Sequence, residues 1–79
     1  MYLHLGGTMI INTDELILVE NLERIGSLDD WLRQKAKATR QILDISGGNP
    51  KAAVYTNQQI ILSPISSVTL KKRLKQIPM

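Results

Sequence analysis

Apolar and polar residues follow one another in short blocks through the last third of the chain. Residues 54–56 are strand formers, residues 57–59 are polar, and residues 60–62 are apolar again. Two strand-forming runs with a brief polar interruption are typical of a tight antiparallel hairpin. The pattern therefore predicts a hairpin over residues 52–62, with Pro64 ending its second strand.

A helix is predicted directly after this hairpin. Helical backbone is disfavoured for a residue before proline, so Ser63 should be extended and the helix can begin only at Ser66 or Ser67. Both of these serines are good N-cap residues. The apolar residues that follow at helical spacing are Leu70, Leu74 and Ile77.

Four positive charges lie beside this apolar seam. Lys71, Lys72 and Lys75 fall on one outer flank of the predicted helix. Arg73 falls on the other flank, and Lys51 precedes the hairpin. These five side chains are the candidates for contact with nucleic-acid phosphates. Alternatively, the lysines complement the helix C-terminus and the acidic half of a neighbouring subunit.

The first twenty residues predict three further strands. Residues 2–5 alternate between apolar and polar, and two glycines at 6–7 close this first strand. Residues 8–12 should form the second strand and residues 16–20 the third. Residues 12–15, between them, are rich in side chains that bond to their own backbone in turns.

Two of these strands carry apolar residues at successive positions, 10–11 and 16–19. Strands of this kind need cover on both faces of their sheet. Two short helices are too few to cover both faces, so we expect a neighbouring subunit to close the uncovered face.

The longer helix is predicted to begin at Ser27, whose hydroxyl can cap it. Asp29 and Asp30 lie where the helix N-terminus favours negative charge. The residues expected in the buried stripe are Leu28, Trp31, Leu32 and Ala36, with Lys35 at its edge. Trp31 should lie at the centre of the contact between this helix and the sheet.

The basic residues expected to point outward from this helix are Arg33, Lys37 and Arg40. Arg33 should pair with Asp29, four residues earlier, in the favourable order. These charges are best explained as a solvated face that complements the helix dipole, and a DNA-contacting face is the alternative.

Residues 41–46 should form another strand, and residues 46–51 a loop that contains Gly47 and Gly48. Successive glycines can form a nest of N–H groups for phosphate, but the spacing of a P-loop or a dinucleotide-binding turn is absent. A simple turn is preferred. The predicted fold class is α+β: a small twisted, mostly antiparallel sheet of about four to five strands with one longer helix and a short basic C-terminal helix.

The length of 79 residues predicts a single domain, residues 1–79. A domain of this size buries only about 60% of the surface that its unfolded chain exposes. Disulfides and a structural metal are excluded as compensation because the chain has no Cys and one His, so oligomerisation remains. The absence of Cys, of a long apolar run and of a secretion signal fits a cytoplasmic protein.

The net charge of +3 is unevenly distributed. Residues 1–32 hold six Asp and Glu against one Arg, a net charge of −5, whereas residues 33–79 hold nine Lys and Arg against one Asp, a net charge of +8. A basic half favours a polyanionic partner, most often nucleic acid. A head-to-tail ring, in which acidic and basic halves of neighbours meet, explains the same asymmetry.

Catalytic and metal-binding interpretations have little support. His4 has no second ligand or carboxylate at a useful spacing, so a hydrogen-bonded structural role at a sheet edge or interface is preferred. The serines of the C-terminal segment lack the context of a nucleophile and are better explained as caps. We therefore expect no enzymatic activity, cofactor, metal, small-molecule substrate or membrane partner.

Residues 1–6 (MYLHLG) and 60–74 (IILSPISSVTLKKRL) resemble the RemB branch of the bacterial extracellular-matrix regulatory proteins, the RemA/RemB-like family. The resemblance is collinear over nearly the whole chain, and residues 20–46 agree in pattern rather than identity. It implies a small α+β fold related to LytTR-type DNA-binding domains and a ring-like homo-oligomer of about eight subunits. It also implies transcriptional control of biofilm matrix genes through binding of double-stranded DNA.

One departure from the family affects the functional expectation. DNA contact in the RemA branch is attributed to arginines in two loops. These loops fall here near Glu15 and at Gly48 and Asn49, and none of these residues is basic. The preferred function is a DNA-binding transcriptional regulator, and the chief alternative is an assembly or protein-interaction module without direct DNA contact. An RNA-binding or small-ligand module is disfavoured, because three aromatic residues are too few to stack single strands.

Overall fold

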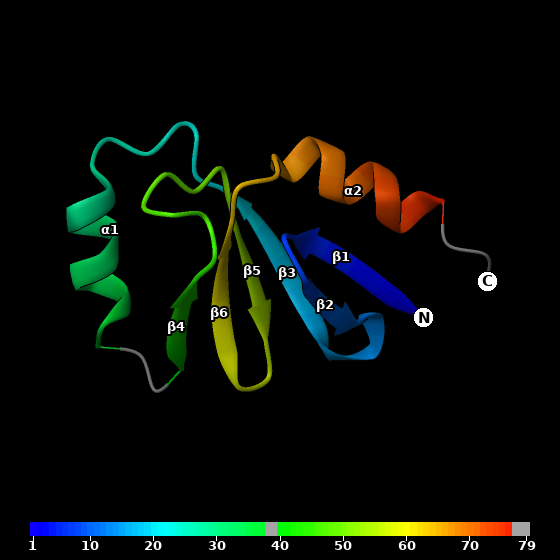
Figure 1. Ribbon diagram of the computed structural model, residues 1–79. Helices are drawn as coiled ribbons and strands as arrows, with labels where there is room; N and C mark the ends of the chain where they lie inside the picture. The colour runs from blue at the N-terminus through cyan, green and yellow to red at the C-terminus, as the bar shows by residue number, and fades with distance from the viewer. Residues whose placement is uncertain (38–39, 77–79) are drawn as a thin grey trace.

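The hairpin predicted from the sequence forms the centre of an α+β structure (Figure 1). The computed structural model describes residues 1–37 and 40–76. In chain order its elements are β1 (Tyr2–Gly6), β2 (Met9–Asn12), a 3₁₀ helix η1 (Thr13–Glu15), β3 (Leu16–Asn21), α1 (Leu28–Lys35), β4 (Gln41–Asp44), β5 (Ala52–Thr56), β6 (Gln59–Ser63) and α2 (Ser67–Lys75). Among the described residues, no helix is long and apolar enough to cross a membrane.

The strands form two sheets rather than one. β1 and β2 make a two-stranded antiparallel ribbon, and the larger sheet has the order β3-β5-β6-β4. β3 pairs with β5 and β5 with β6 in antiparallel fashion, whereas β4 runs parallel to β6. The α+β class and the mostly antiparallel pairing are confirmed.

The expectation of one sheet of four to five strands was wrong for the first two strands. The Asn12 side chain accepts a hydrogen bond from the backbone N–H of Asp14 and so starts η1, which redirects the chain between β2 and β3. Leu3, Leu5 and Ile11 of the ribbon are buried, so the ribbon packs face-on against the larger sheet instead of extending its edge.

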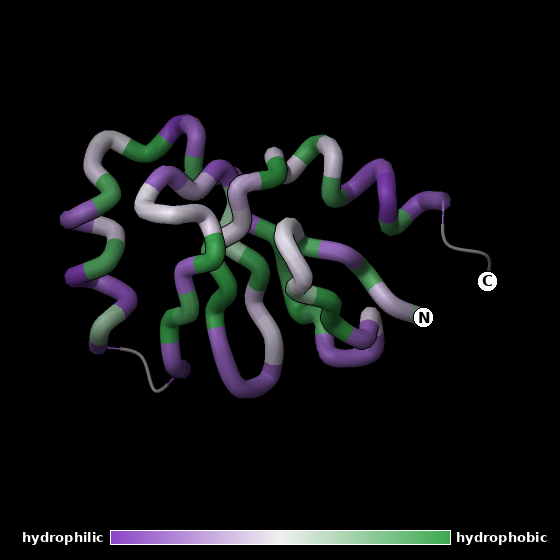
Figure 2. The backbone as a smooth tube through the Cα atoms, viewed as in Figure 1, coloured by the Kyte–Doolittle hydropathy of each residue, from purple (hydrophilic) through white to green (hydrophobic). Residues whose placement is uncertain are grey.

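The β5–β6 hairpin supplies both faces of the core. Ala52 and Val54 lie on one face of β5, and Ala53 and Tyr55 lie on the other, as strand alternation requires. The turn is shorter than the three polar residues suggested, because β6 begins at Gln59. Figure 2 shows hydrophobic residues along these strands and hydrophilic residues in the turn that joins them.

One face of the larger sheet is covered by the ribbon and α2, and we name this cluster the ribbon-side core. Its buried members are Leu3, Leu5, Ile11, Ala52, Val54, Ile61 and Leu70. The other face is covered by α1, and we name this cluster the α1-side core. Its buried members are Leu22, Trp31, Ala53, Tyr55, Ile60 and Leu62. The domain therefore has three layers, and the prediction for Trp31 is confirmed.

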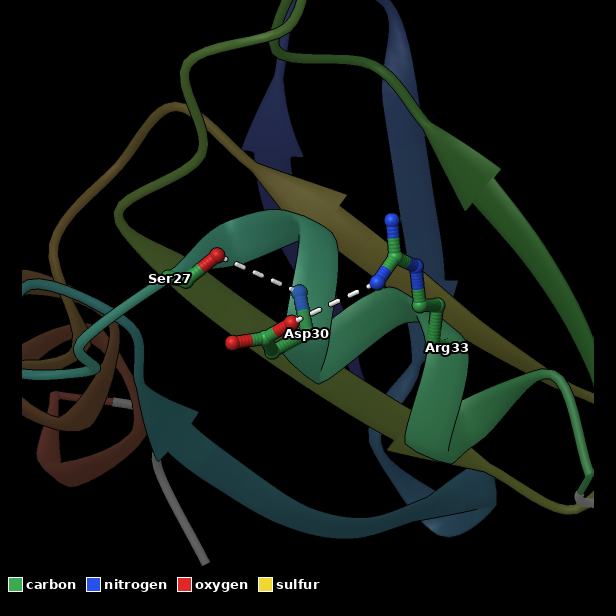
Figure 3. Close-up of polar contacts among 3 residues, drawn as sticks. All are labelled: Ser27, Asp30 and Arg33. Carbon is green, nitrogen blue, oxygen red and sulfur yellow. Dashed lines mark hydrogen bonds and ion pairs between the residues drawn. The ribbon is translucent and has the colours of Figure 1, made fainter.

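Helix α1 begins as predicted but ends early. The Ser27 hydroxyl accepts a hydrogen bond from the Asp30 N–H at 3.3 Å, and the Arg33 guanidinium lies 3.8 Å from the Asp30 carboxylate (Figure 3). The predicted partner Asp29 was therefore wrong by one residue. Such an exposed pair contributes little stability.

The other differences lie at the C-terminal end of α1. Ala36 is the C-cap and is exposed, so its place in the buried stripe was wrong. Arg40 is outside the helix and donates from Nε to the Thr56 carbonyl at 3.0 Å, rather than pointing outward from α1. Residues 38–39 of the expected helix lie outside the described residues, as does Ile77 of the C-terminal one.

A close contact joins the ribbon to the start of α2. Gly6 has φ +122°, and a Cβ at this position would lie 2.9 Å from Cγ of Pro64. The neighbouring Ser63 hydroxyl is buried and donates to the Leu5 carbonyl at 2.6 Å. Only glycine fits both the backbone conformation and the space at residue 6.

Candidate nucleic-acid interface

Helix α2 exposes three lysines and packs against the ribbon-side core with its apolar residues. Its N-cap is Ser66, one of the two serines predicted as the start, and the Ser66 hydroxyl accepts a hydrogen bond from the Thr69 N–H at 3.2 Å. Leu70 is buried in the ribbon-side core and Leu74 packs against it. The basic side chains left exposed on the helix are Lys71, Lys72 and Lys75. These three lysines, named here the α2 lysines, are the basic candidates that the structure brings together.

Arg73 differs from the α2 lysines. Its guanidinium donates from one Nη to the His4 carbonyl at 3.0 Å, and the side chain is partly buried. A guanidinium held against the β1 backbone is already supplying a tertiary contact. Arg73 therefore fixes α2 on the ribbon, and its position on the opposite flank agrees with the helical spacing.

Lys51 lies in a different place. Its backbone N–H donates to the Ser63 carbonyl at 2.9 Å, and its carbonyl accepts from the Leu22 N–H at 3.0 Å. These bonds hold it at the start of β5 with an exposed side chain. Lys51 ends the loop between β4 and β5. Figure 1 shows this loop well apart from the C-terminal end of α2, so Lys51 does not join the α2 lysines within one chain.

The glycine-containing loop after β4 is organised by a carboxylate of the chain itself. The Asp44 carboxylate accepts hydrogen bonds from the Ser46 N–H at 2.8 Å and the Gly48 N–H at 3.1 Å, and also from the Ser46 hydroxyl. The Ser46 hydroxyl bond, with these amide bonds, holds the pKa of Asp44 below its ordinary value. Asp44 thus occupies the amides that a phosphate would need, which matches the simple-turn interpretation, and β4 ends at Asp44 rather than at residue 46.

Glu15 lies at the opposite end of the larger sheet from this loop. The register pairs Leu16 with Thr56 and Asn21 with Ala52, so η1 lies beside the β5–β6 turn while the loop before Ala52 lies at the other end. Glu15 and residues 56–59 line a shallow polar depression there. Within one chain, these two loop positions cannot make a single patch.

His4 has the structural environment predicted for it. Its ring nitrogen Nε2 lies 2.7 Å from the Gly7 carbonyl, to which it donates a hydrogen bond. The His4 carbonyl in turn accepts the bond from Arg73. Within residues 1–37 and 40–76, no group of three or more His, Cys, Asp or Glu is placed to hold a metal ion.

The family model described as RemA-like, extracellular matrix regulatory protein A-like, matches residues 2–74. The chain belongs to this family. Extracellular matrix regulatory protein B of Bacillus subtilis (strain 168) is 33% identical to it over 75 residues, which cover 92% of this chain and 89% of that protein. Membership in this RemA-like family implies a regulatory role.

In this RemA-like protein, sequence reasoning missed one polar cluster in the α1-side core. Glu20 accepts hydrogen bonds from the Trp31 indole and from the Tyr55 hydroxyl, and the Lys35 ammonium lies over both aromatic rings. The available signal was the single acid, Glu20, that follows the apolar run of residues 16–19. This cluster fixes α1 on the sheet and is separate from the α2 lysines.

Proposed function

We propose that this RemA-like protein is a DNA-binding transcriptional regulator of extracellular-matrix genes that acts as a ring-like homo-oligomer in the cytoplasm. The observation that carries the proposal is the set of exposed α2 lysines on a helix whose other side is anchored by Leu70 and Arg73. The name of the Bacillus subtilis relative supports the regulatory class. The proposed role is non-enzymatic and needs no small-molecule substrate or cofactor.

The electrostatics favour many weak contacts over one strong site. The α2 lysines are exposed point charges without a rigid hydrogen-bonding fork, so they suit phosphates rather than base edges. One subunit offers few such charges and should bind DNA poorly. A ring that holds several copies against one duplex multiplies the contacts by raising their effective concentration.

Exposed apolar residues support the oligomer. Ile10, Ile17, Leu18 and Leu43 are exposed in the isolated chain, although large apolar side chains gather in cores or interfaces. A ring of about eight subunits is one closed arrangement that can bury such residues. A relation of this fold to LytTR-type DNA-binding domains is part of the same proposal.

Titration of a labelled duplex at about 50 and 200 mM salt tests DNA binding, because log K falls by about 0.9 per phosphate neutralised for each tenfold rise in salt. We expect the double variant Lys71→Gln/Lys75→Gln to weaken binding and flatten this slope while the oligomer keeps its size. The matched control Arg24→Gln/Arg33→Gln removes the same charge from exposed positions outside α2 and should change the slope little.

Arg73 is left unchanged in this test because it contacts His4. Salt-independent binding, or no binding of the native protein at low salt, would rule the DNA-binding role out. A smaller oligomer in the α2 variant, with unchanged binding per subunit, would instead place the α2 lysines at a subunit interface.

An assembly module without DNA contact is the second candidate. Two acidic groups favour it: Glu15 is exposed on η1, and Asp44 fills the amides of the loop that contains Gly48. Glu15 lies near one position where the RemA branch is expected to use arginine, and Asp44 binds the backbone of the loop that contains the other, at Gly48. If these loops approach DNA, Glu15→Gln/Asp44→Asn should strengthen duplex binding at low salt, and an unchanged affinity would place both loops away from DNA.

A further inference from the structure

Both edges of the larger sheet are open in the isolated domain. In the order β3-β5-β6-β4, and among residues 1–37 and 40–76, β3 pairs only with β5 and β4 pairs only with β6. An unpaired edge presents a row of N–H and C=O groups that can pair with another chain. Each subunit therefore has two free edges, one at each side of the same sheet.

The β3 edge is marked by two successive apolar side chains. Leu16 pairs with Thr56 and Leu18 with Tyr55, so the strand contains one extra residue, Ile17, as in a β-bulge. Ile17 is 48% exposed and Leu18 is 47% exposed. Leu18 shares the face of its pairing partner Tyr55, which is the α1 side of the sheet. Helix α1 therefore leaves the sheet uncovered at Leu18.

The β4 edge has its exposed apolar residue on the opposite face. Leu43 is 39% exposed and pairs with Ile61, which belongs to the ribbon-side core. Ile42, the residue before it, packs in the α1-side core. The exposed positions are thus offset: Leu18 lies at the β3 edge on the α1 side of the sheet, and Leu43 lies at the β4 edge on the ribbon side.

Strand direction makes the two edges compatible. β3 is antiparallel to β5, β5 is antiparallel to β6, and β4 is parallel to β6, so β3 and β4 point the same way. If β4 of one copy is placed beside β3 of another, the sheet continues with its faces preserved. The α1 of one copy then extends toward Ile17 and Leu18 of the other, and the ribbon of the second extends toward Leu43 of the first.

The charges at the two edges are also complementary. Asp14 and Glu15 immediately precede β3. Arg40 immediately precedes β4, and Lys37 lies three residues before Arg40 in the sequence. Both strands start at the end of the sheet where the β5–β6 turn lies, as the pairings of Leu16 with Thr56 and of Gln41 with Gln59 require. Continuation of the sheet therefore brings the acidic start of β3 beside the basic start of β4.

We propose that β3 of each subunit pairs in parallel with β4 of the next, so that a single sheet runs through the assembly. This inference rests on the proposed homo-oligomer and specifies its interface. The contact is head-to-tail, with different surfaces from the two partners, which is the kind of interface that generates a ring. The occupant of each open edge is a second copy of this chain.

Two variants that each block one edge test the proposal by light scattering. We expect Leu18→Lys, at the β3 edge, and Leu43→Lys, at the β4 edge, to be monomers while the native protein is an oligomer. An equimolar mixture should form a dimer of twice the monomer mass, because each variant keeps the edge that the other lacks. The double variant should stay monomeric, and Val68→Lys, an exposed position on α2, should keep the native size.

Either edge variant retaining the native size, or a mixture that stays monomeric, would overturn the edge pairing and leave the homo-oligomer standing. A monomeric native protein would refute both. If the circular dichroism spectrum shows that a variant is unfolded, an exchange of charges between the two edges tests the proposal instead. Glu15→Lys should shrink the oligomer, and adding Lys37→Glu in the same chain should restore it. No restoration would refute the proposed juxtaposition of these edges.

Discussion

The indole Nε1 of Trp31 donates a hydrogen bond to the carboxylate of Glu20 at 3.3 Å. The second oxygen of this carboxylate accepts from the Tyr55 hydroxyl at 2.7 Å, and the Lys35 ammonium lies 5.7 Å from the Trp31 ring and 5.6 Å from the Tyr55 ring. A polar link thus crosses the interface between α1 and the sheet. Because its donors are aromatic side chains, the link and the apolar packing depend on the same residues.

Replacement of Trp31 should be the most costly change in α1. Trp31→Ala should lower the free energy of unfolding by about 3–5 kcal/mol, since it removes a buried aromatic side chain and leaves a cavity. Trp31→Phe keeps an aromatic ring but lacks the donor to Glu20, so it should cost less. Denaturant unfolding followed by circular dichroism measures both, and an unchanged midpoint for Trp31→Ala would contradict this placement.

Stability should fall at alkaline pH through Tyr55. Burial, assisted by the hydrogen bond and negative charge of Glu20, raises the pKa of Tyr55 above its ordinary value. The folded state then holds this proton more tightly than the unfolded state, so the stabilisation is fully present below about pH 10 and is lost as pH rises through the folded pKa.

Tyr55→Phe should remove this alkaline loss, whereas Tyr2→Phe, at an exposed position, should keep it. Unfolding free energies measured from neutral to alkaline pH provide the comparison. Tyrosinate absorbance in the native protein and in the two variants assigns each ionisation. Identical alkaline profiles for Tyr55→Phe and the native protein would show that another group is responsible.

Gly6 and Gly26 form a matched pair for testing the contact with Pro64. Gly6→Ala should destabilise the domain by about 1–3 kcal/mol, because it forces a Cβ against the Pro64 ring at positive φ. Gly26→Ala adds a methyl group where nothing lies within 4 Å and should be close to neutral. Thermal unfolding of both variants measures the difference, and equal melting temperatures would refute the close approach.

Local signals in the sequence were sufficient for most elements. Ser27 and Ser66 mark helix starts through the chemistry of their own hydroxyls, and Pro64 limits its neighbours directly. The strand-forming residues 54–56 and the apolar residues 60–62 were enough to predict the central hairpin. Each of these signals acts within a few residues, so no knowledge of distant partners was needed.

Pairings between distant segments were not predictable in the same way. The parallel contact of β4 with β6 and the face-on packing of the ribbon depend on which surfaces remain free after the hairpin forms. The role of Arg73 was also not predictable. Its spacing places it on a basic flank of the helix, but its contact with His4 depends on the tertiary fold. The sequence was therefore sufficient to place exposed lysines on α2, but not to show that Arg73 and Lys51 lie apart from them.

The contacts that complete the ribbon-side core also determine the order in which the chain can fold. The bond from Ser63 to Leu5 spans 58 residues, and that from Arg73 to His4 spans 69 residues. The buried members of the α1-side core and its Glu20 cluster lie within residues 20–62, so this core can assemble while the chain ends are still apart. We expect pulsed hydrogen exchange to protect α1 before β1, and simultaneous protection would contradict this order. On the ribosome, the surface that buries β1 is then complete only after the last-made helix has emerged.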